Sequence, residues 1–581
     1  MSKRRLFILL CGFCLCILLF SIRLLWVQMV SVNSLSGKRL TVQSVLQRQQ
    51  RVILDNSRGQ FYDRSGEPLT GKHIHALCVF PAALPLQFSQ AERIADILNV
   101  KVEEWNRFVA GLKVPSIWKD RNGQEMDLTV QQIERIRTLG IAGIMVVPYT
   151  VRYSEPFQAS HLIGFLSENP QRIQQQYRAE LERGILDPTS RIGAAGLELK
   201  LDRLLLGQEP TVLSLHTDAN QHVLAGLGTG LTSSHNIHYP LKVMLTIDRT
   251  IQQRLEQEVD QYMQSRGLRE AAVVLMDADQ REVVAMISRP AFNPNAPNMR
   301  SGNWANHSIE AAVPGSIYKI VIAAAALEKK VVRPNEVFNC QGTLGRYGFQ
   351  CWKERGHGPL TFSEAFAQSC NITFAQVAVR LAPNDIIETA RKLGVLEGYD
   401  VLPEEQSGRV FGSMEDAADP GILVQTAIGQ RDVRITPLQA ANMVVSLLHR
   451  GEVVRPKLVK EIRFHNGSLL KKEPTERLVK EREGISSYTA NTILGMMEQV
   501  VQHGTGITLK QHPWKLAGKS GTAQLGEHGE NGDNEWFIGY GPVPSPRYAM
   551  AVMVKDDRGA QGHQGTELFG RIMRVLAEGP F

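Results

Sequence analysis

The 581-residue sequence has no dense tract of basic residues and no interleaving of basic with aromatic residues, although its formal net charge is +7. Chains that bind nucleic acid usually concentrate Lys and Arg in such tracts, so we expect no nucleic-acid partner. Internal repeats and low-complexity segments are also lacking. With 43% hydrophobic and 21% charged residues, the composition is that of a folded protein, and the length predicts roughly two to four domains.

Cysteine is scarce. Three of the seven cysteines, Cys11, Cys14 and Cys16, lie in the apolar N-terminus, and the others are Cys78, Cys340, Cys351 and Cys370. Cys340 and Cys351 bracket a Gly-rich loop and could pair as a disulfide, although spacing alone does not establish the geometry. A zinc site that includes His357 is the weaker alternative, because these cysteines show no Cys-x-x-Cys spacing. We therefore predict no metal and no cofactor.

One apolar run is long enough to cross a bilayer, and no second comparable run follows. Ser2-Lys-Arg-Arg5 precedes Leu6–Ile22, which contains no charged residue. Basic residues before the run and few cations just after it predict a cytoplasmic tail at 1–5, a transmembrane anchor at 6–28 and the remaining chain outside the cell. A cleaved signal peptide is the alternative. We disfavour it because the run exceeds the usual length and no Ala-x-Ala site follows.

Hydrophobic periodicity predicts the elements of the remaining chain. We expect helices over 90–112, 129–139, 251–263, 361–379, 385–393, 437–448 and 568–577, and strands over 141–151, 243–248, 271–276, 282–287, 536–540 and 548–554. The Gly- and Ser-rich segment 226–239 indicates a domain boundary. Strands open and close the C-terminal part with helices between them, which predicts an α+β fold with one antiparallel sheet covered by helices.

A Pro-Gly break precedes Ser316. Ser316-Ile-Tyr-Lys319 then opens an Ala-rich apolar run, so we predict a buried helix with Ser316 in its first turn. Residues three apart share a helix face, which lets the hydroxyl and the amine meet. A serine needs a base to become a nucleophile. Lysine can be that base when burial or a second cation lowers its pKa.

Two further polar clusters follow Ser316. In Ser369-Cys370-Asn371 the hydroxyl can relay a proton and the amide can hold the substrate and Lys319. In Lys519-Ser520-Gly521-Thr522 the lysine can attract a substrate carboxylate and disfavour a charge on Lys319, and glycine allows close approach of a strand. The backbone N–H groups of Ser316 and Thr522 would form an oxyanion hole. We predict catalytic roles for Ser316, Lys319, Ser369, Asn371 and Lys519 and substrate binding by Ser520, Gly521 and Thr522.

The order of the clusters is more specific than any one of them. Ser-x-x-Lys also occurs at 116–119 and 468–471, and Ser-x-Asn occurs elsewhere in the chain. Between Ser316 and Lys519, however, Ser369-Cys-Asn371 is the one Ser-x-Asn, and Lys519-Ser-Gly521 is the one Lys-(Ser/Thr)-Gly in the chain. This ordered set is shared by penicillin-binding proteins and class A β-lactamases.

The chain resembles a class B penicillin-binding protein over nearly its whole length. Beside the anchor and the three clusters, the resemblance rests on Arg58-Gly-x-x-x-Asp63-Arg-x-Gly66, Arg152-Tyr153 with His161, Gly196-Leu-Glu198, Leu245-Thr-Ile-Asp248 with Gln252, Ser288-Arg-Pro290 with Asn293-Pro-Asn295, Gly356-His-Gly358, Ile428-Gly-Gln430 with Thr436-Pro-Leu-Gln439, and Trp536-Phe-Ile-Gly-Tyr540. Two positions depart from the family pattern. Ser520 stands where Thr is commoner, and Arg431 stands where Gly is usual, which puts the local loop shape in question.

The resemblance implies an elongated α+β pedestal of dimerisation type at 29–235 and a penicillin-binding transpeptidase domain at 240–581, with an antiparallel sheet flanked by helices and a helical lobe. It implies a peptidoglycan D,D-transpeptidase that forms an acyl-enzyme on a serine from a stem peptide ending in D-Ala-D-Ala and is trapped by β-lactams. The implied partners are the stem peptides, the membrane and a polytopic glycan polymerase. The implied location is the cell membrane, with a single span and the N-terminus in the cytoplasm.

Two other classes of function share some of these features. A membrane-anchored serine β-lactamase would need a water-activating Glu, and no Glu-x-x-x-Asn stands between Asn371 and Lys519, although Glu404 and Glu405 lie in that interval. A catalytically silent scaffold of wall synthesis is the second alternative. Intact clusters argue against it.

Overall fold

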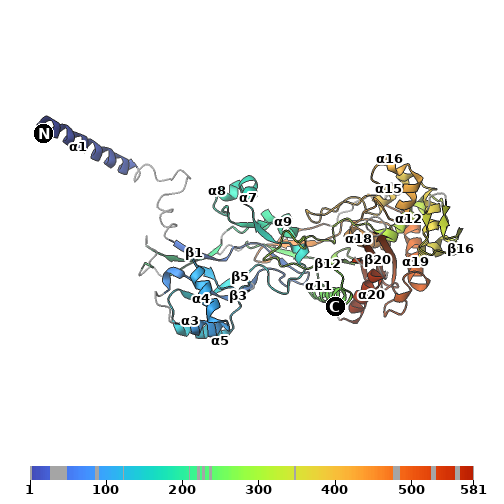
Figure 1. Cartoon of the computed structure of the whole chain (residues 1–581), viewed down its shortest axis with the longest axis horizontal. Coiled ribbons are helices and arrows are strands. Elements are labelled where there is room, and N and C mark those ends of the chain that lie inside the picture. Colours follow the sequence, from blue (N-terminus) through green and yellow to red (C-terminus); the bar gives the residue numbers. More distant parts are fainter. Residues whose placement is uncertain are drawn as a thin grey trace. The chain divides into compact units, whose positions relative to one another are not determined.

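The structure is a computed structural model of the whole chain. It describes residues 3–26, 49–84, 90–121, 123–208, 210–218, 223–224, 229–233, 238–345, 349–474, 484–524, 532–556 and 563–579. The chain forms two compact units. The first comprises Met1–Ser57, His73–Val151 and Glu209–His235, and the second comprises Arg58–Lys72, Arg152–Gln208 and Asn236–Phe581. Figure 1 shows the elements in sequence colours.

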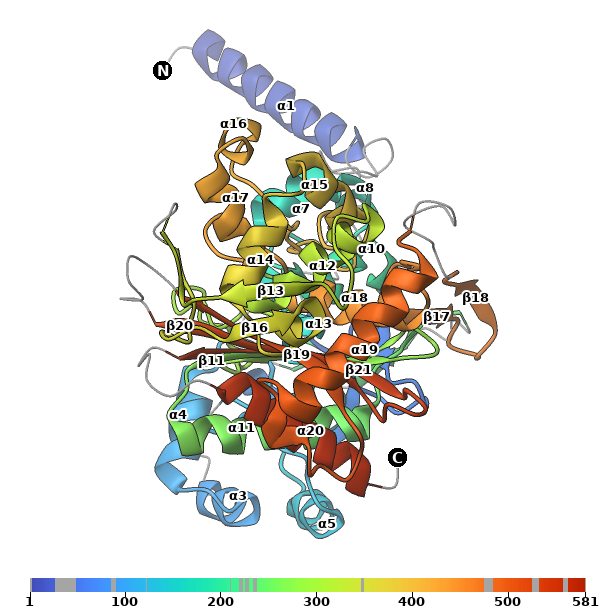
Figure 2. The ribbon, with the colours of Figure 1, turned by 90° about the vertical axis from the view of Figure 1, so that its right-hand side faces the viewer.

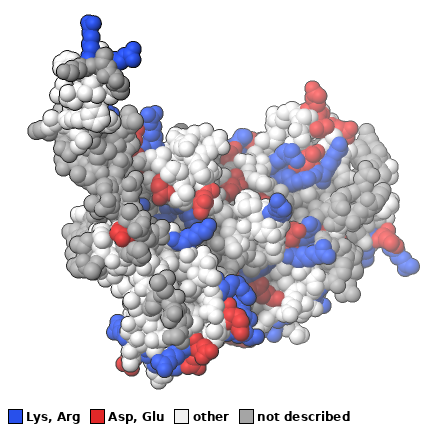
Figure 3. Space-filling model, turned by 60° about the vertical axis from the view of Figure 1, so that its left-hand side comes forward, with Lys and Arg blue, Asp and Glu red and all other residues white. Residues whose placement is uncertain are grey.

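The predicted N-terminal helix is present as α1 (Lys3–Leu25). It is long and apolar enough to cross a membrane, and none of its most apolar stretch is buried against the protein. Figure 3 shows basic side chains at the tip of this helix and uncharged side chains next to them. Exposed apolar side chains in such number need a nonpolar surrounding, which fits a membrane protein. Residues 27–28 of the predicted anchor lie outside the described residues.

Apart from α1, the described part of the first unit holds two small sheets, the 3₁₀ turn η2 (Pro81–Ala83) and the helices α3, α4 and α5 (Figure 1). One sheet has the order β1-β8-β9 and the other β4-β3-β5. Their bounds are β1 (Gln49–Asp55), β8 (Thr211–His216), β9 (Thr229–Thr232), β3 (Lys72–Val79), β4 (Ser116–Ile117) and β5 (Ile144–Val151). The helix predicted over 90–112 is instead two helices, α3 (Ala91–Leu98) and α4 (Val102–Gly111), because Asn99 adopts a left-handed conformation that ends α3. The predicted helix over 129–139 is α5 (Val130–Leu139), capped by Thr129.

The second unit begins with short elements around a buried ion network. The elements are β2 (Gln60–Tyr62), α6 (Ser160–Ile163), β6 (Leu166–Glu168), α7 (Pro170–Gln176), α8 (Arg178–Glu182), β7 (Arg191–Gly193), α9 (Gly196–Lys200) and α10 (Asp202–Leu205). Fully buried Glu198 accepts hydrogen bonds from Arg58, Arg152 and the Tyr153 hydroxyl at 2.9, 2.6 and 2.9 Å. Three of the motifs quoted above for the family resemblance therefore meet at one carboxylate.

We expect Glu198→Gln to destabilise the protein by about 3–5 kcal/mol, because it leaves the buried Arg58 and the half-buried Arg152 without a full counter-charge. The midpoint of thermal unfolding measures the change. Glu182→Gln is the matched control, since it removes an exposed pair with Arg178 and should cost less than about 0.5 kcal/mol. Equal losses for the two variants would contradict a structural role for the network.

The predicted antiparallel sheet covered by helices is confirmed. Its order is β12-β11-β21-β20-β19, and every neighbouring pair is antiparallel. The strands are β11 (Glu270–Asp277), β12 (Val283–Arg289), β19 (Ala517–Gln524), β20 (Asp533–Gly541) and β21 (Tyr548–Asp556). In Figure 2, α11 (Arg249–Arg266) and α20 (Gln564–Glu578) lie on one side of this sheet and α18 (Pro437–Leu448) lies on the other.

Burial on both faces follows from the sequence of the strands. Alternate side chains of β11 enter two different cores: Val273 and Leu275 pack with α11 and α20, whereas Ala272 and Val274 join the core that holds α12 (Lys319–Glu328) and α18. Two buried faces require an almost continuous apolar strand, which Ala271–Met276 provides. A second sheet of the unit has the order β18-β17-β10-β2, with β10 (Lys242–Leu245), β17 (Val459–Arg463) and β18 (Leu469–Lys472).

Helices, 3₁₀ turns and short strands make up the rest of the described second unit. They are the 3₁₀ turn η3 (Gly315–Tyr318), β13 (Val337–Cys340), β14 (Thr343–Leu344), β15 (Phe349–Gln350), β16 (Gly358–Thr361), α13 (Phe362–Ala367), α14 (Asn371–Ala378), α15 (Pro383–Lys392), α16 (Met414–Ala417), α17 (Pro420–Ala427), α19 (Ser487–His503) and η5 (Ile507–Leu509). The helix predicted over 361–379 is broken. Ser369 has a positive φ of 52°, and Cys370 is extended and caps α14.

Candidate active site

Ser316 lies in η3, one residue after the Pro314-Gly315 break. The sequence predicted it in the first turn of an α-helix, whereas the turn is 3₁₀ and the α-helix starts at Lys319. Residues three apart are eclipsed in a 3₁₀ turn, so Ser316 and Lys319 still share a face. Ser316 is half-buried and lines a cleft, while Lys319 is completely buried below it.

Lys319 is held by the second cluster. Its Nζ donates to the backbone oxygen of Ser369 at 2.7 Å, to Asn371 Oδ1 at 2.8 Å and to Ser369 Oγ at 3.2 Å. The break between α13 and α14 turns all three acceptors toward the amine. A non-glycine residue in the left-handed region costs about 1–3 kcal/mol, and Ser369 adopts it at the point where two functional groups converge.

The second lysine reaches the same hydroxyl. Lys519 Nζ donates to Ser369 Oγ at 3.0 Å and to the backbone oxygen of Ser520 at 2.9 Å. Ser369 Oγ thus lies between two buried amines. This oxygen can accept a proton from a charged lysine and donate its own proton to the lone pair of a neutral one.

Burial disfavours the charge on both lysines. It lowers the pKa of Lys319 to about 7, against the opposing effect of the nearby Cys370 and Cys351. The pKa of Lys519 is also well below its usual range, first because of burial and then because of Lys319. The sequence predicted that burial or the second cation Lys519 would disfavour a charge on Lys319, and burial is the main cause of its lowered pKa. Lys319 can therefore exist as a neutral amine near neutral pH.

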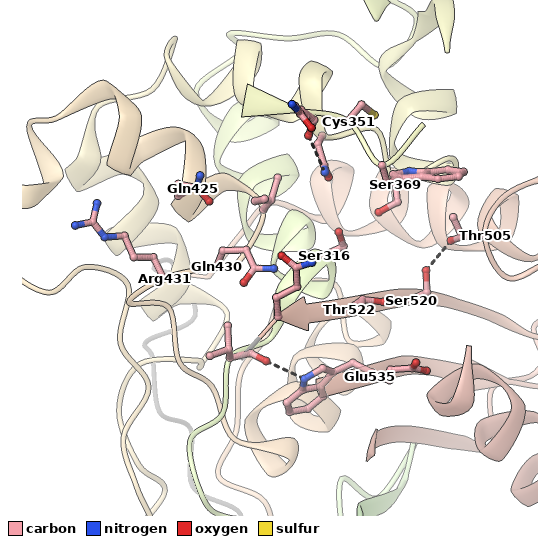
Figure 4. A pocket seen from close by; sticks show the side chains of 18 of the residues that line it. Ser316, Cys351, Ser369, Gln425, Gln430, Arg431, Thr505, Ser520, Thr522 and Glu535 are labelled. Carbon is pink, nitrogen blue, oxygen red and sulfur yellow. Dashed lines mark hydrogen bonds between the residues drawn. The ribbon is translucent and has the colours of Figure 1, made fainter. Parts of the chain in front are cut away.

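The third cluster lies on the edge strand β19. Side chains alternate along a strand: Lys519 and Gly521 are buried, while Ser520 and Thr522 are more accessible. Ser520 Oγ is 2.6 Å from Thr505 Oγ1, a pair visible in Figure 4. Thr505 follows α19. It was not predicted from the sequence, because a single threonine in a loop belongs to no recognisable motif.

Glycines bring β19 against the turn that carries Ser316. A Cβ on Gly521 would lie 2.8 Å from the Pro314 oxygen, and one on Gly315 would lie 2.3 Å from the Thr522 oxygen. Gly315 also has a positive φ of 55°. No other residue type fits without displacing the backbone. This close approach places the backbone amides of Ser316 and Thr522 in neighbouring segments, as an oxyanion hole made from these two groups requires.

The clusters open onto a cleft of about 1250 Å³. Figure 4 shows Ser316, Ser369, Ser520 and Thr522 around it, together with residues that the motif analysis did not assign. Glu535, Trp536, Gln425 and Gln430 line the cleft, as do Arg431 and Arg434. Among the described residues of the lining neither buried lysine appears, so the hydroxyls, and not the amines, form the surface that a ligand meets.

Arg431 stands where the family usually has glycine, and its backbone conformation bears on the shape of the loop. Its φ is 60°, the left-handed region that favours glycine. The backbone at Arg431 therefore takes a conformation that glycine readily adopts. The Arg431 side chain adds a positive charge at the cleft (Figure 4).

Three cysteines of this region, Cys340, Cys351 and Cys370, are free in the structure. Cys340 and Cys351 are free thiols and do not form the disulfide that their positions around the loop suggested. Their sulfur atoms instead gather with those of a third cysteine, Cys370, and with the imidazole of His357. A group of this kind, with His357, was only the weaker alternative predicted from the sequence, and its Cys370 lies within the second cluster.

Comparison with known proteins agrees with this arrangement. The profile of the Penicillin binding protein transpeptidase domain matches residues 271–574, more than half of the chain, and that of the Penicillin-binding Protein dimerisation domain matches residues 54–229. Stage V sporulation protein D of Bacillus subtilis is 28% identical over 599 residues, covering 98% of this chain and 85% of the relative.

Two further matches are informative. Peptidoglycan D,D-transpeptidase PbpA of Mycolicibacterium smegmatis is 28% identical over 343 residues, covering 53% of this chain and 67% of the relative. A solved structure described as "Structural coordination of polymerization and crosslinking by a peptidoglycan synthase complex" aligns with a TM-score of 0.68 and 21% identity over 99% of both chains, which shows a shared fold. Together with the site, these matches show that the chain belongs to the penicillin-binding proteins, as a class B member with a C-terminal transpeptidase domain.

Proposed function

We propose that the protein is a peptidoglycan D,D-transpeptidase that cross-links stem peptides through an acyl-enzyme on Ser316. The observation that carries the proposal is the placement of Ser369 Oγ between Lys319 and Lys519, next to a serine at the mouth of a cleft. A nucleophile, a base of suitable pKa and a path for a proton are the parts that serine acyl transfer needs.

Acylation would proceed as follows. Neutral Lys319 takes the proton of Ser316 Oγ as this oxygen attacks the carbonyl carbon of the penultimate D-Ala. The negative oxygen that forms accepts hydrogen bonds from the backbone N–H groups of Ser316 and Thr522. When the C–N bond breaks, the amine of the terminal D-Ala needs a proton, and Ser369 Oγ can pass one from the lysines.

The substrate carboxylate would be bound at the third cluster. Ser520, Thr522 and Thr505 present hydroxyls to the cleft, and Lys519 lies behind them with its amine against the Ser520 backbone. A hydroxyl donates a hydrogen bond to a carboxylate at lower desolvation cost than a buried ammonium. Lys519 would thus act mainly by orienting Ser369 and by supplying positive potential. An amine from a second stem peptide then attacks the ester and restores Ser316.

The pH dependence of acylation should show the titration of Lys319. The base must be neutral, and its pKa is about 7, so the acylation rate should rise with pH through neutrality and level off above it. We expect a rise of about tenfold between pH 6 and pH 8. Stopped-flow acylation by a β-lactam whose own charge is constant over this range measures it. A flat profile would mean that the base is not Lys319.

The two alternative functions receive less support. A β-lactamase needs a carboxylate that activates water. Glu404 and Glu405 accept backbone hydrogen bonds from Gly196, Tyr399 and Val401, and neither lines the cleft. Glu535 does line it, but its carboxylate accepts a hydrogen bond from the Gln564 backbone N–H. A silent scaffold would not need to keep two buried lysines on one serine hydroxyl, because a buried amine costs free energy unless it is used or paired.

We also propose the membrane arrangement and the partners. Arg4 and Arg5 begin the apolar part of α1, so the N-terminus lies in the cytoplasm by the distribution of basic residues, and the cleft faces the wall. We propose the division into a tail (1–5), an anchor (6–28), a pedestal (29–235) and a transpeptidase domain (240–581). A polytopic glycan polymerase is the proposed partner, supported by the likeness in fold to the chain of a synthase complex.

The experiment that tests the function is a coupled wall-synthesis assay. The full-length protein is combined in liposomes with a glycan polymerase and lipid II, and the products are digested and separated as muropeptides. Cross-linked dimers should form with the wild type and disappear when a β-lactam is added. Uncross-linked glycan in both cases, with an acylated and folded protein, would contradict the transpeptidase assignment.

A further inference from the structure

Cys340, Cys351, Cys370 and His357 form a compact cluster beside the cleft. Each can offer one ligand atom, and these four atoms all lie within 4.8 Å of one another. All three cysteines are buried, and His357 is half-buried. A tetrahedral zinc ion with Zn–S bonds of about 2.3 Å separates its sulfur atoms by about 3.8 Å. Side-chain rotations are therefore enough to close the cluster around an ion.

The backbone brings these residues together from separate segments. Cys340 ends β13 and pairs with Gly358 of β16, next to His357. Cys351 follows β15, and its N–H donates to the Gly342 oxygen at 2.8 Å. The loops cross tightly: a Cβ on Gly356 would lie 2.1 Å from the Cys340 oxygen. In Figure 2, β13 and β16 lie beside α13 and α14, and Cys370 caps the latter.

The two hydrogen bonds that Thr373 donates to Cys370 favour the thiolate form of this cysteine. Cys370 Sγ accepts from the Thr373 backbone N–H at 3.5 Å and from Thr373 Oγ1 at 3.4 Å, at the N-terminus of α14. Peptide N–H groups and a helix N-terminus stabilise the anionic form. His357 Nδ1 lies 3.6 Å from Cys351 Sγ, and its other nitrogen is buried without a hydrogen-bond partner among the described residues. Among the described residues, Cys351 Sγ is therefore the hydrogen-bond partner of this imidazole.

We propose that Cys340, Cys351, Cys370 and His357 bind a zinc ion that holds the second cluster of the active site in place. Three thiolates and one imidazole form a complete tetrahedral donor set with no open position, which is typical of a structural site. This assignment replaces the expectation of no metal that the absence of Cys-x-x-Cys spacing suggested. A pair of Cys-x-x-Cys motifs provides four ligands from two short segments, whereas here folding brings the four ligands together from separate positions in the chain.

The zinc ion would affect catalysis by fixing the positions of active-site residues, and it would take no part in the reaction itself. Cys370 stands between Ser369 and Asn371, the residues that hold Lys319. Asn371 also donates to the Gln350 oxygen, next to Cys351, at 3.4 Å. An ion bound to Cys351 and Cys370 would join the β15 loop to the start of α14. It would thereby fix the left-handed Ser369 and the acceptors around Lys319.

A disulfide is the competing use of these sulfur atoms. It would pair two of the three thiols and leave the third thiol and the imidazole unused, whereas one zinc ion engages all four groups. The two states also differ in mass and in reactivity: a disulfide releases two thiols only after reduction, and a zinc site releases three after a chelator is added.

The test is the metal content of the full-length protein purified without added metal and without a polyhistidine tag. Plasma mass spectrometry should find about one zinc per chain. Exchange with Co²⁺ should give the intense absorption of cobalt–thiolate bonds and the visible bands of a tetrahedral ion. Cys351→Ser and His357→Ala should lose the zinc at least partly, and Cys78→Ser, which changes a buried thiol of the first unit, should retain it.

Chelation experiments on the wild-type protein do not depend on whether the variants fold. A strong zinc chelator should release the ion, expose three alkylatable thiols and lower the thermal midpoint. It should also slow penicillin acylation about tenfold or more, with recovery on adding Zn²⁺. The first readouts do not depend on the proposed function, and the last does. Less than 0.1 zinc per chain with no Co²⁺ spectrum, or a disulfide found in the native protein, would overturn the proposal.

Discussion

Ser316→Ala is expected to abolish labelling by fluorescent penicillin and to reduce acylation by roughly 10⁴-fold or more, because no other group can form the ester. The serine is half-buried and alanine keeps its backbone contacts, so the variant should fold. The measurement is in-gel fluorescence after incubation of membranes with the labelled antibiotic, with the thermal midpoint as a check on folding.

The two other Ser-x-x-Lys sites provide matched controls. Ser116→Ala and Ser468→Ala change serines of the same sequence pattern, but Ser116 lies in β4 and Ser468 precedes β18. Both variants should be labelled like the wild type. Labelling of Ser316→Ala at the wild-type level, with loss in one of the controls, would show that the nucleophile was assigned to the wrong serine.

Lys319→Arg should lower acylation by about 10³-fold although the positive charge is kept. Arginine remains protonated at all accessible pH values and cannot take the proton from Ser316, and a general base contributes about 10²–10⁴-fold. The acylation rate should also no longer rise between pH 6 and pH 8, because the group that titrates is gone. Stopped-flow kinetics with the same β-lactam measures both effects.

A structural explanation of the same loss must be separated from loss of the base. The guanidinium is larger than the amine and replaces a group with three tight contacts. Lys319→Met removes the base without adding volume or charge, and it should be as slow as Lys319→Arg. If Lys319→Met acylates like the wild type, the base lies elsewhere. If it is slow and keeps the wild-type rise with pH, Lys319 affects the site only through packing.

Much of the architecture was predictable because it depends on local sequence. The bounds of α18 match the prediction over 437–448, since Thr436 caps the helix and Pro437 opens it. The hairpin of β11 and β12 follows from two apolar runs joined by a turn. The prediction of one helix over 361–379 was wrong because the segment is mostly apolar and carries no Pro or Gly that would signal a break. The break at Ser369 is imposed by tertiary contacts that override helix propensity.

The active site was likewise predictable where it depends on sequence motifs and unpredictable where it depends on tertiary contacts. Motif order brought Ser316, Lys319, Ser369, Asn371 and Lys519 into one hypothesis. In the structure both lysine amines contact Ser369 Oγ, and Ser316, Ser369 and Asn371 line one cleft. Sequence could not show that both lysines are buried, or that Thr505 meets Ser520. From the sequence, pairing of Cys340 with Cys351 was also favoured over a zinc site that includes His357. Residues Cys340 and Cys370 are brought together by folding over a long stretch of chain, and spacing carries no signal for that.

The central claim is that Ser316 is the nucleophile, and peptide mapping of the penicillin adduct tests it most directly. The full-length protein is acylated with a β-lactam, quenched in acid and digested, and the modified peptide is sequenced by mass spectrometry. We predict a single ester adduct on Ser316, stable over many minutes before quenching, as expected for a transpeptidase trapped by an antibiotic. An adduct on another residue, or a protein that remains unmodified at saturating β-lactam while correctly folded, would contradict the account.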